Sequence, residues 1–118
     1  MSATPTTNAG SATNEPAYAW AALEQALIGR RPVRVRYKGH DRIICPHVLG
    51  WKNNRPKVLA YQIEGGTSDG PLPTDPARRW RSMFITDIED TVIVEGAWQT
   101  GPNYTPTSNN IDQVALHH

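Results

Sequence analysis

The chain has 118 residues, enough for about one domain, and its 12 Lys and Arg residues against 11 Asp and Glu residues give a formal net charge of +1. This length excludes a large multi-domain enzyme, and no apolar run approaches the roughly 18 residues that a membrane-spanning helix needs. A single cysteine, Cys45, excludes an internal disulfide and a cysteine-rich zinc site, and with no secretory signal pattern at the N-terminus it favours a soluble cytoplasmic protein.

The first part of the chain divides into a tail and a helix. Residues 1–15 have no hydrophobic periodicity and are rich in Ser, Thr, Ala and Asn, so we predict a disordered N-terminal tail. Residues 16–28 begin with a proline, which suits a first helical turn, and then repeat apolar side chains at three- and four-residue spacing. Gly29 stands where a helix stop is expected. We therefore predict one short amphipathic helix.

Beyond the helix the apolar period changes to two, which is typical of strands. The first strand is predicted at residues 33–38, and a glycine-containing turn leads to the second strand at residues 42–51. Pro46 interrupts the second strand and predicts an edge or a bulge, because proline cannot donate to the ladder. Asn53-Asn54 predicts a two-residue turn, since Asn tolerates positive φ. Three further strands are predicted at residues 57–63, 80–86 and 91–95.

The rest of the chain consists of a long loop and a second tail. Residues 64–76 are rich in Gly and Pro, and a loop of this length in so small a domain is often functional or mobile. Residues 100–118 contain further breakers and predict a flexible C-terminal tail, in which the His117-His118 pair is either native or an expression remnant. Three of its apolar residues are able to pack back, namely Ile111, Val114 and Leu116. The ordered domain is therefore predicted at residues 16–99, mainly β with one N-terminal helix, as a small five-stranded barrel or a strongly bent sheet.

The positive charges are concentrated in one part of the chain. Nine positive residues and one acid lie between Arg30 and Lys57, a net charge of +8, and acidic stretches flank this block. A total near zero therefore does not exclude an anionic partner, because a ligand responds to the local field. Aromatic rings interleave with the basic residues, and this combination is typical of sites for single-stranded nucleic acid or a nucleotide. The candidate phosphate contacts are Arg34, Arg36, Lys57 and Arg81, and the candidate stacking rings are Trp51 and Tyr61.

Two other interpretations of these residues stay open. The basic side chains are equally expected on a solvated outer face that keeps the protein soluble and protects strand edges. Most of the rings are expected in the core. The sequence alone does not choose between a binding face and a solvated face.

Catalytic and metal-binding patterns are weak. Cys45 and His47 lie two positions apart on a strand and so face the same side, but an apolar run surrounds the cysteine and favours a small buried side chain. No motif supplies an oxyanion site. His40 and His47 lack metal-ligand spacing. We therefore predict a non-enzymatic protein that needs no cofactor or metal.

The order and spacing of several segments resemble the WYL-domain family over about residues 20–95. The helix end with the first strand, the proline-bearing second strand, the Asn-Arg turn with the third strand, and the closing strand all have counterparts there. These segments are residues 26–37, 45–51, 53–62 and 81–88. The resemblance implies an Sm-like, SH3-type five-stranded barrel that senses an anionic ligand, such as nucleic acid or a nucleotide, and that controls an effector protein.

Two motifs depart from the family pattern. Pro56, Lys57 and Val58 stand where the family has its Trp-Tyr-Leu triplet, and Phe84 stands where it has the arginine most associated with ligand binding. Arg81 is then a displaced substitute for that arginine. The alternative function is a protein-interaction or self-association module without nucleic-acid binding, in which basic and acidic bands pair between copies as a homodimer or a head-to-tail chain.

Overall fold

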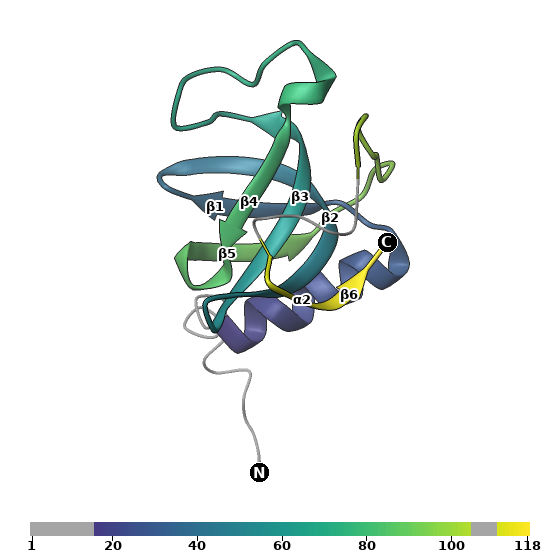
Figure 1. The fold of residues 1–118 in the computed structure, drawn as a ribbon. Coiled ribbons are helices and arrows are strands. Elements are labelled where there is room, and N and C mark those ends of the chain that lie inside the picture. The colour runs from purple at the N-terminus through teal and green to yellow at the C-terminus, as the bar shows by residue number, and fades with distance from the viewer. Residues whose placement is uncertain (1–15, 105–110) are drawn as a thin grey trace.

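The computed structural model describes residues 16–104 and 111–118, and it shows a mainly β protein with one N-terminal helix (Figure 1). The tail predicted at residues 1–15 lies outside the described residues. Among the described residues, no helix combines the length and the apolar character of a membrane-spanning segment. The elements in chain order are α2 (Pro16–Gly29), β1 (Val33–Tyr37), β2 (His40–Lys52), β3 (Arg55–Gly65), the 3-10 turn η2 (Pro76–Arg78), β4 (Trp80–Phe84), the 3-10 turn η3 (Ile85–Asp87), β5 (Ile88–Ile93) and β6 (Gln113–His117).

The strands form one antiparallel sheet in the order β4-β3-β2-β1-β5, and β6 pairs with β2. The first part of β2 pairs with β1 and its last part pairs with β6, so the long β2 bends through the middle of the sheet (Figure 1). The sheet is not closed, because η3 turns the chain between β4 and β5 and these two described strands do not pair. The prediction of a five-stranded barrel is therefore corrected to an open sheet of six strands.

The turns and the bulge follow from the local sequence. Asn53 and Asn54 have φ values of 53° and 65° and form the predicted two-residue turn between β2 and β3. Lys38 and Gly39 make the same kind of turn between β1 and β2, with φ values of 50° and 80°. The register of β2 against β3 shifts just after Pro46, which confirms the predicted bulge.

The helix ends where the sequence predicts, but the residue in the left-handed conformation is not the glycine. Helix α2 includes Gly29, and the next residue, Arg30, has φ 53°. The Arg31 N–H donates to the Ala26 carbonyl oxygen at 2.8 Å, a bond that closes the helix in the manner of a Schellman motif. A side chain with a Cβ is strained in this conformation by roughly 1–2 kcal/mol.

The main core lies between α2 and the face of the sheet that the helix covers. Leu23 and Ala26 of the helix are fully buried against Val33 and Val35 of β1 and Met83 of β4. The alternating burial of β1 confirms its predicted amphipathic pattern. A smaller apolar cluster on the other face of the sheet contains Val48, Leu59 and Ile111.

The strand β6 belongs to the segment that was predicted to be a tail. It lies beside β2, and Ile111 just before it is buried. Gly50 of β2 makes this close approach possible, because a Cβ at this position would collide with the backbone carbonyl oxygen of Gln113. The sixth strand therefore depends on a glycine more than sixty residues earlier in the chain.

Candidate anion-binding pocket

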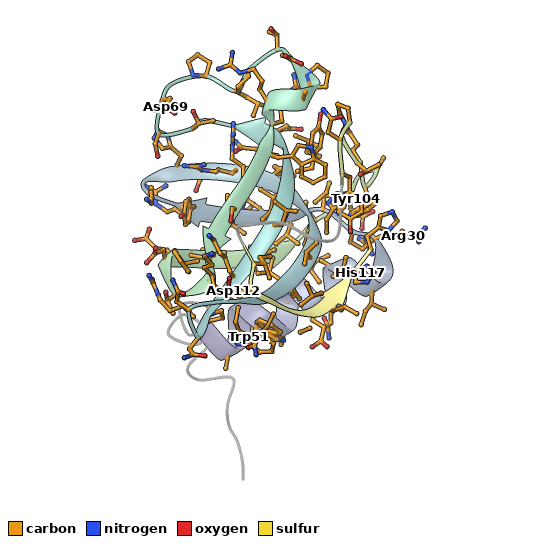
Figure 2. The ribbon with its side chains drawn as sticks, viewed as in Figure 1. Arg30, Trp51, Asp69, Tyr104, Asp112 and His117 are labelled. Carbon is orange, nitrogen blue, oxygen red and sulfur yellow. The ribbon has the colours of Figure 1, made fainter. Side chains whose placement is uncertain are left out.

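A pocket of about 400 Å³ opens where β2 begins, β3 ends and β4 begins. The loop of residues 66–75, between β3 and η2, forms one of its walls, and Figure 2 shows Asp69 on this loop at the top of the view. We call this site the arginine pocket. Its lining residues are Arg42, Thr67, Ser68, Asp69, Pro71, Pro73, Arg78 and Arg81.

The chain enters the loop through a glycine that the geometry requires. Gly65 has φ +101°, and a Cβ at this position would collide with the backbone carbonyl oxygen of Asp41. Gly65 is also the partner of Arg42 in the β2–β3 register. The close approach of the two backbones therefore starts the loop directly beside this arginine.

Arg42 is a buried cation at the base of the pocket. Its side chain faces the core side of β2, and the residue is 3% exposed. One guanidinium nitrogen donates to the Tyr37 carbonyl oxygen at 3.2 Å, and the guanidinium lies 5.1 Å from the centre of the Tyr37 ring. Its buried Nε has no hydrogen-bond partner within the part of the chain that the structure describes. Burial, followed by the nearby positive charge of Arg81, lowers the pKa of Arg42, although an arginine stays protonated in any protein.

Arg81 is the second cation of the pocket, and its orientation is fixed by hydrogen bonds. Its Nε donates to Oε1 of Gln62 at 3.0 Å, and Nη1 donates at 3.2 Å to the carbonyl oxygens of Arg78 and Trp80. Burial lowers the pKa of Arg81, and the negative charge of Asp69 acts in the opposite direction. The guanidinium is therefore held in place beside Arg42.

Gln62 connects this arginine to the loop. It is fully buried, and its amide nitrogen donates at 3.0 Å to the carbonyl oxygens of Glu64 and Gly66. Its amide oxygen accepts the bond from Arg81. One buried side chain thus positions both the start of the loop and the guanidinium that faces it, so Gln62 is a positioning residue.

The loop itself is held by a tight turn. Thr67 and Gly70 exchange backbone hydrogen bonds of 2.8 Å and 3.1 Å. The Thr67 hydroxyl donates to the Gly70 carbonyl oxygen and accepts from the Asp69 N–H. Farther along, Arg79 Nε donates to the Pro73 carbonyl oxygen at 2.7 Å. These bonds give the pocket wall a defined shape.

The arginine pocket carries excess positive charge. Three guanidinium groups line it against one carboxylate, that of Asp69. In the part of the chain that the structure describes, neither Arg42 nor Arg81 has a carboxylate within ion-pairing distance. A guanidinium presents planar N–H donors that match the oxygens of a phosphate or carboxylate. The arrangement is suited to holding an anion.

The two predicted phosphate contacts on β1 lie outside this pocket. Arg34 and Arg36 are exposed on the outer side of β1, opposite its buried valines. Arg36 forms ion pairs with Asp41 at 3.2 Å and with Glu89 at 3.5 Å. The acidic partners therefore reduce the charge that Arg36 presents to a ligand.

Lys57 lies on the opposite face of the sheet from Arg81. Lys57 is paired with Phe84 across β3 and β4, whereas Arg81 is three residues before Phe84, and side chains alternate along a strand. Lys57 is mostly buried, with Nζ 4.5 Å from the centre of the Phe84 ring, and the guanidinium of Arg55 lies 3.8 Å from the same centre. Burial, and then the charges of Lys52 and Arg55, lower the pKa of Lys57. Of the four predicted phosphate contacts, Arg81 alone lines the arginine pocket.

The two predicted stacking rings already have ring partners. Trp51 stacks on Trp20 of α2 with 5.2 Å between ring centres, and Figure 2 shows it beside the helix. Tyr61 is buried, packs edge-on against Trp80, and donates its hydroxyl to the Pro76 carbonyl oxygen at 3.1 Å. Both rings therefore contribute to packing in this structure.

Cys45 and His47 do not form an activated pair. His47 Nδ1 donates to the backbone oxygen of Cys45, and Nε2 accepts from the Thr100 hydroxyl at 2.8 Å, so neither ring nitrogen bonds the thiol. Burial raises the pKa of the Cys45 thiol, which the Gln99 N–H only partly offsets. Among the described residues no group of three or more His, Cys, Asp and Glu side chains is placed to hold a metal ion.

Sequence reasoning missed Arg42, Gln62 and Thr67. For the first two a signal exists in the strand alternation. Arg42 is two positions from the buried Ile44, and Gln62 is two positions from the buried Ala60, so each polar residue continues the core-facing side of its strand. A polar side chain on that side has to find buried partners, which is a reason to look there for a site.

Comparisons with known proteins identify no relative of this chain: no protein-family model, no curated protein and no solved structure matches it. The resemblance to WYL domains therefore rests on the segments quoted above. The arginine pocket is defined by its own geometry, independently of any relative.

Proposed function

We propose that this chain is a non-enzymatic, WYL-like ligand-binding module that holds an anionic ligand, such as single-stranded nucleic acid or a nucleotide, in the arginine pocket. The observation that carries the proposal is Arg42, a buried guanidinium that has no carboxylate partner among the described residues, beside a second arginine in an open pocket. Burying a charge without a counter-charge costs on the order of several kcal/mol. A bound anion offsets that cost, so the pocket favours its occupied state.

The resemblance to WYL domains is kept as part of this proposal. The order of one helix followed by β1 to β5 supports it, although the sheet is open. Arg81, which the resemblance offers as a displaced substitute for the family's ligand-binding arginine, lines the pocket. The proposed regulatory role follows from the resemblance: an effector protein responds to whether the ligand is bound.

A titration with labelled oligonucleotides at two salt concentrations tests the proposed function. Phosphate contacts predict an affinity that falls steeply with salt. The variant Arg81→Gln removes one pocket charge and is expected to weaken binding by roughly tenfold or more. The matched control is Arg34→Gln, which removes the same charge from the outer face of β1 and should change the affinity by less than about twofold. No binding by the unmodified protein at low salt, or equal losses in the two variants, contradicts the proposal.

A second candidate function is self-association, and the strand edges favour it. Among the described strands, β4 and β5 each pair on one side only, so both present an open edge. The β4 end carries arginines at 78, 79 and 81, whereas β5 and the turn before it carry acids at 87, 89 and 90. Head-to-tail contact of these edges joins opposite charges. Light scattering across a salt series measures this, and a monomer at every concentration and salt rules it out.

A further inference from the structure

We propose that the arginine pocket takes a phosphate monoester, the doubly charged terminal phosphate of a nucleotide or of an oligonucleotide end, in preference to the internal phosphodiester of a nucleic-acid strand. This inference rests on the proposed function and names the chemical class of ligand that the same pocket selects. It concerns which phosphate enters the pocket, and the choice of base plays no part in it.

The charge of the pocket matches a dianion. Arg42, Arg78 and Arg81 against Asp69 leave two uncompensated positive charges among the lining residues. A phosphate monoester carries about −1.5 to −2 charges near pH 7 and has three terminal oxygens to accept hydrogen bonds. An internal phosphodiester carries one charge and has two such oxygens. The monoester therefore neutralises the pocket more completely.

The donors of the pocket are held in place before a ligand arrives. Arg42 is buried and bonded to the Tyr37 carbonyl oxygen, so its guanidinium already lies at the pocket in the absence of a ligand. Gln62 fixes the plane of the Arg81 guanidinium through Nε. Preorganised donors require little side-chain ordering upon binding, which favours a small ligand that has to obtain its affinity from few atoms.

The lining explains why the phosphate is recognised and the base is not. Among residues 16–104 and 111–118, no aromatic side chain lines the pocket, and the apolar residues of the lining are Pro71 and Pro73. The predicted stacking rings, Trp51 and Tyr61, are packed against other rings elsewhere. A volume of about 400 Å³ lies at the lower end of the usual range for small-ligand sites, roughly 300–1,000 Å³. A terminal phosphate with its sugar suits such a space, whereas a continuous strand has to enter and leave it.

The test compares two labelled oligonucleotides of one sequence and length, one with a 5′-phosphate and one with a 5′-hydroxyl, at the same salt concentration. The 5′-phosphate form is expected to bind at least about tenfold more tightly, and Arg81→Gln is expected to abolish that preference. Arg34→Gln is the matched control and should keep it. The exposed Arg78→Gln is a second pocket variant, chosen because it disturbs folding least, and it should reduce the preference.

Competition distinguishes the two sources of the monoester. Displacement of the labelled strand by ribose 5-phosphate at low concentration indicates that a small phosphorylated metabolite is sufficient. Displacement only by another 5′-phosphorylated strand indicates an oligonucleotide end. If the two 5′ forms bind with equal affinity, this inference is overturned. The proposed function stays intact in that case if binding depends on salt and Arg81→Gln still weakens it. Failure of both forms to bind at low salt overturns the inference and the proposed function together.

Discussion

The burial of His47 is expected to make the protein less stable as the pH falls below neutrality. The ring is fully buried among Trp98, Trp80 and Tyr104, with 4.3 Å between the centres of the His47 and Trp98 rings. Burial lowers the pKa of His47 from 6.5 to about 4; the Cys45 carbonyl oxygen opposes this shift and the charge of His118 adds to it. The folded protein therefore keeps a neutral ring at pH values where the unfolded chain is protonated.

The difference between the two pKa values of His47 determines how the free energy of unfolding changes with pH. Above about pH 6.5 the histidine is mainly neutral in the folded and in the unfolded state, so its protonation does not lower the free energy of unfolding. As the pH falls from about 6.5 to 4, the unfolded state binds a proton that the folded state does not, so the free energy of unfolding decreases. At about 1.4 kcal/mol for each unit of pKa, the loss from this residue is about 2 kcal/mol between pH 7 and 5 and about 3 kcal/mol by pH 4.

Urea unfolding at pH 7, 6 and 5 measures this contribution. The variant His47→Gln removes the titrating group. Between pH 7 and 5 we expect the variant to lose about 2 kcal/mol less free energy of unfolding than the unmodified protein loses. This difference does not depend on how stable the variant is at pH 7. The variant His117→Gln removes an exposed histidine and serves as the control. The reasoning is refuted if the unmodified protein and His47→Gln lose the same free energy between pH 7 and 5.

Three further predictions concern packing away from the arginine pocket. Arg30→Gly relieves the left-handed strain at the end of α2 and removes the contact of the guanidinium with the Trp98 ring. We expect the relief of strain to be larger, so that the free energy of unfolding rises by roughly 1 kcal/mol, and an unchanged or lower urea midpoint would contradict this. Gly50→Ala places a Cβ against the Gln113 carbonyl oxygen and should release β6 from β2. We expect faster amide exchange in β6 and a free energy of unfolding that is lower by about 1–3 kcal/mol. Amide protection of β6 that persists in the variant would contradict the role given to Gly50. The buried Cys45 thiol should react with an aromatic disulfide reagent at least about 100-fold more slowly in the native protein than in urea, and equal rates would mean that it is accessible.

The sequence predicts the elements of this fold well where the signal is local. The helix at 16–28, the asparagine turn and the bulge after Pro46 each depend on residues within a few positions of one another. The strand β6 depends instead on pairing with β2 across more than sixty residues; the sequence indicates only that Ile111, Val114 and Leu116 are able to pack back, not where they pack. That the sheet stays open likewise depends on how η3 turns the chain between β4 and β5, which the strand pattern does not contain.

In the candidate site too, the sequence predicts the local features and misses those that depend on long-range pairing. The alternation of β1 correctly predicts that Arg34 and Arg36 face away from the core. It does not predict that Arg42 and Arg81, 39 positions apart, meet at one end of the sheet. That meeting requires the register of β2 against β3 and of β3 against β4, which bring Gly65 beside Arg42 and Ala60 beside Arg81. The register is set by turns and bulges throughout the sheet.

The contacts that each cation already makes decide which part of the basic block is available to a ligand. Arg36 is paired with two carboxylates, and Lys57 lies over the ring of Phe84. Arg42 and Arg81 repel each other in a partly desolvated site and have no paired carboxylate among the described residues. An anion that binds between them removes a repulsion as well as adding an attraction, and both effects are largest where water is excluded. The net charge of +8 between residues 30 and 57 is therefore a poor guide to the binding site, because one of the two central arginines of the pocket lies outside that block and most cations inside it have other contacts.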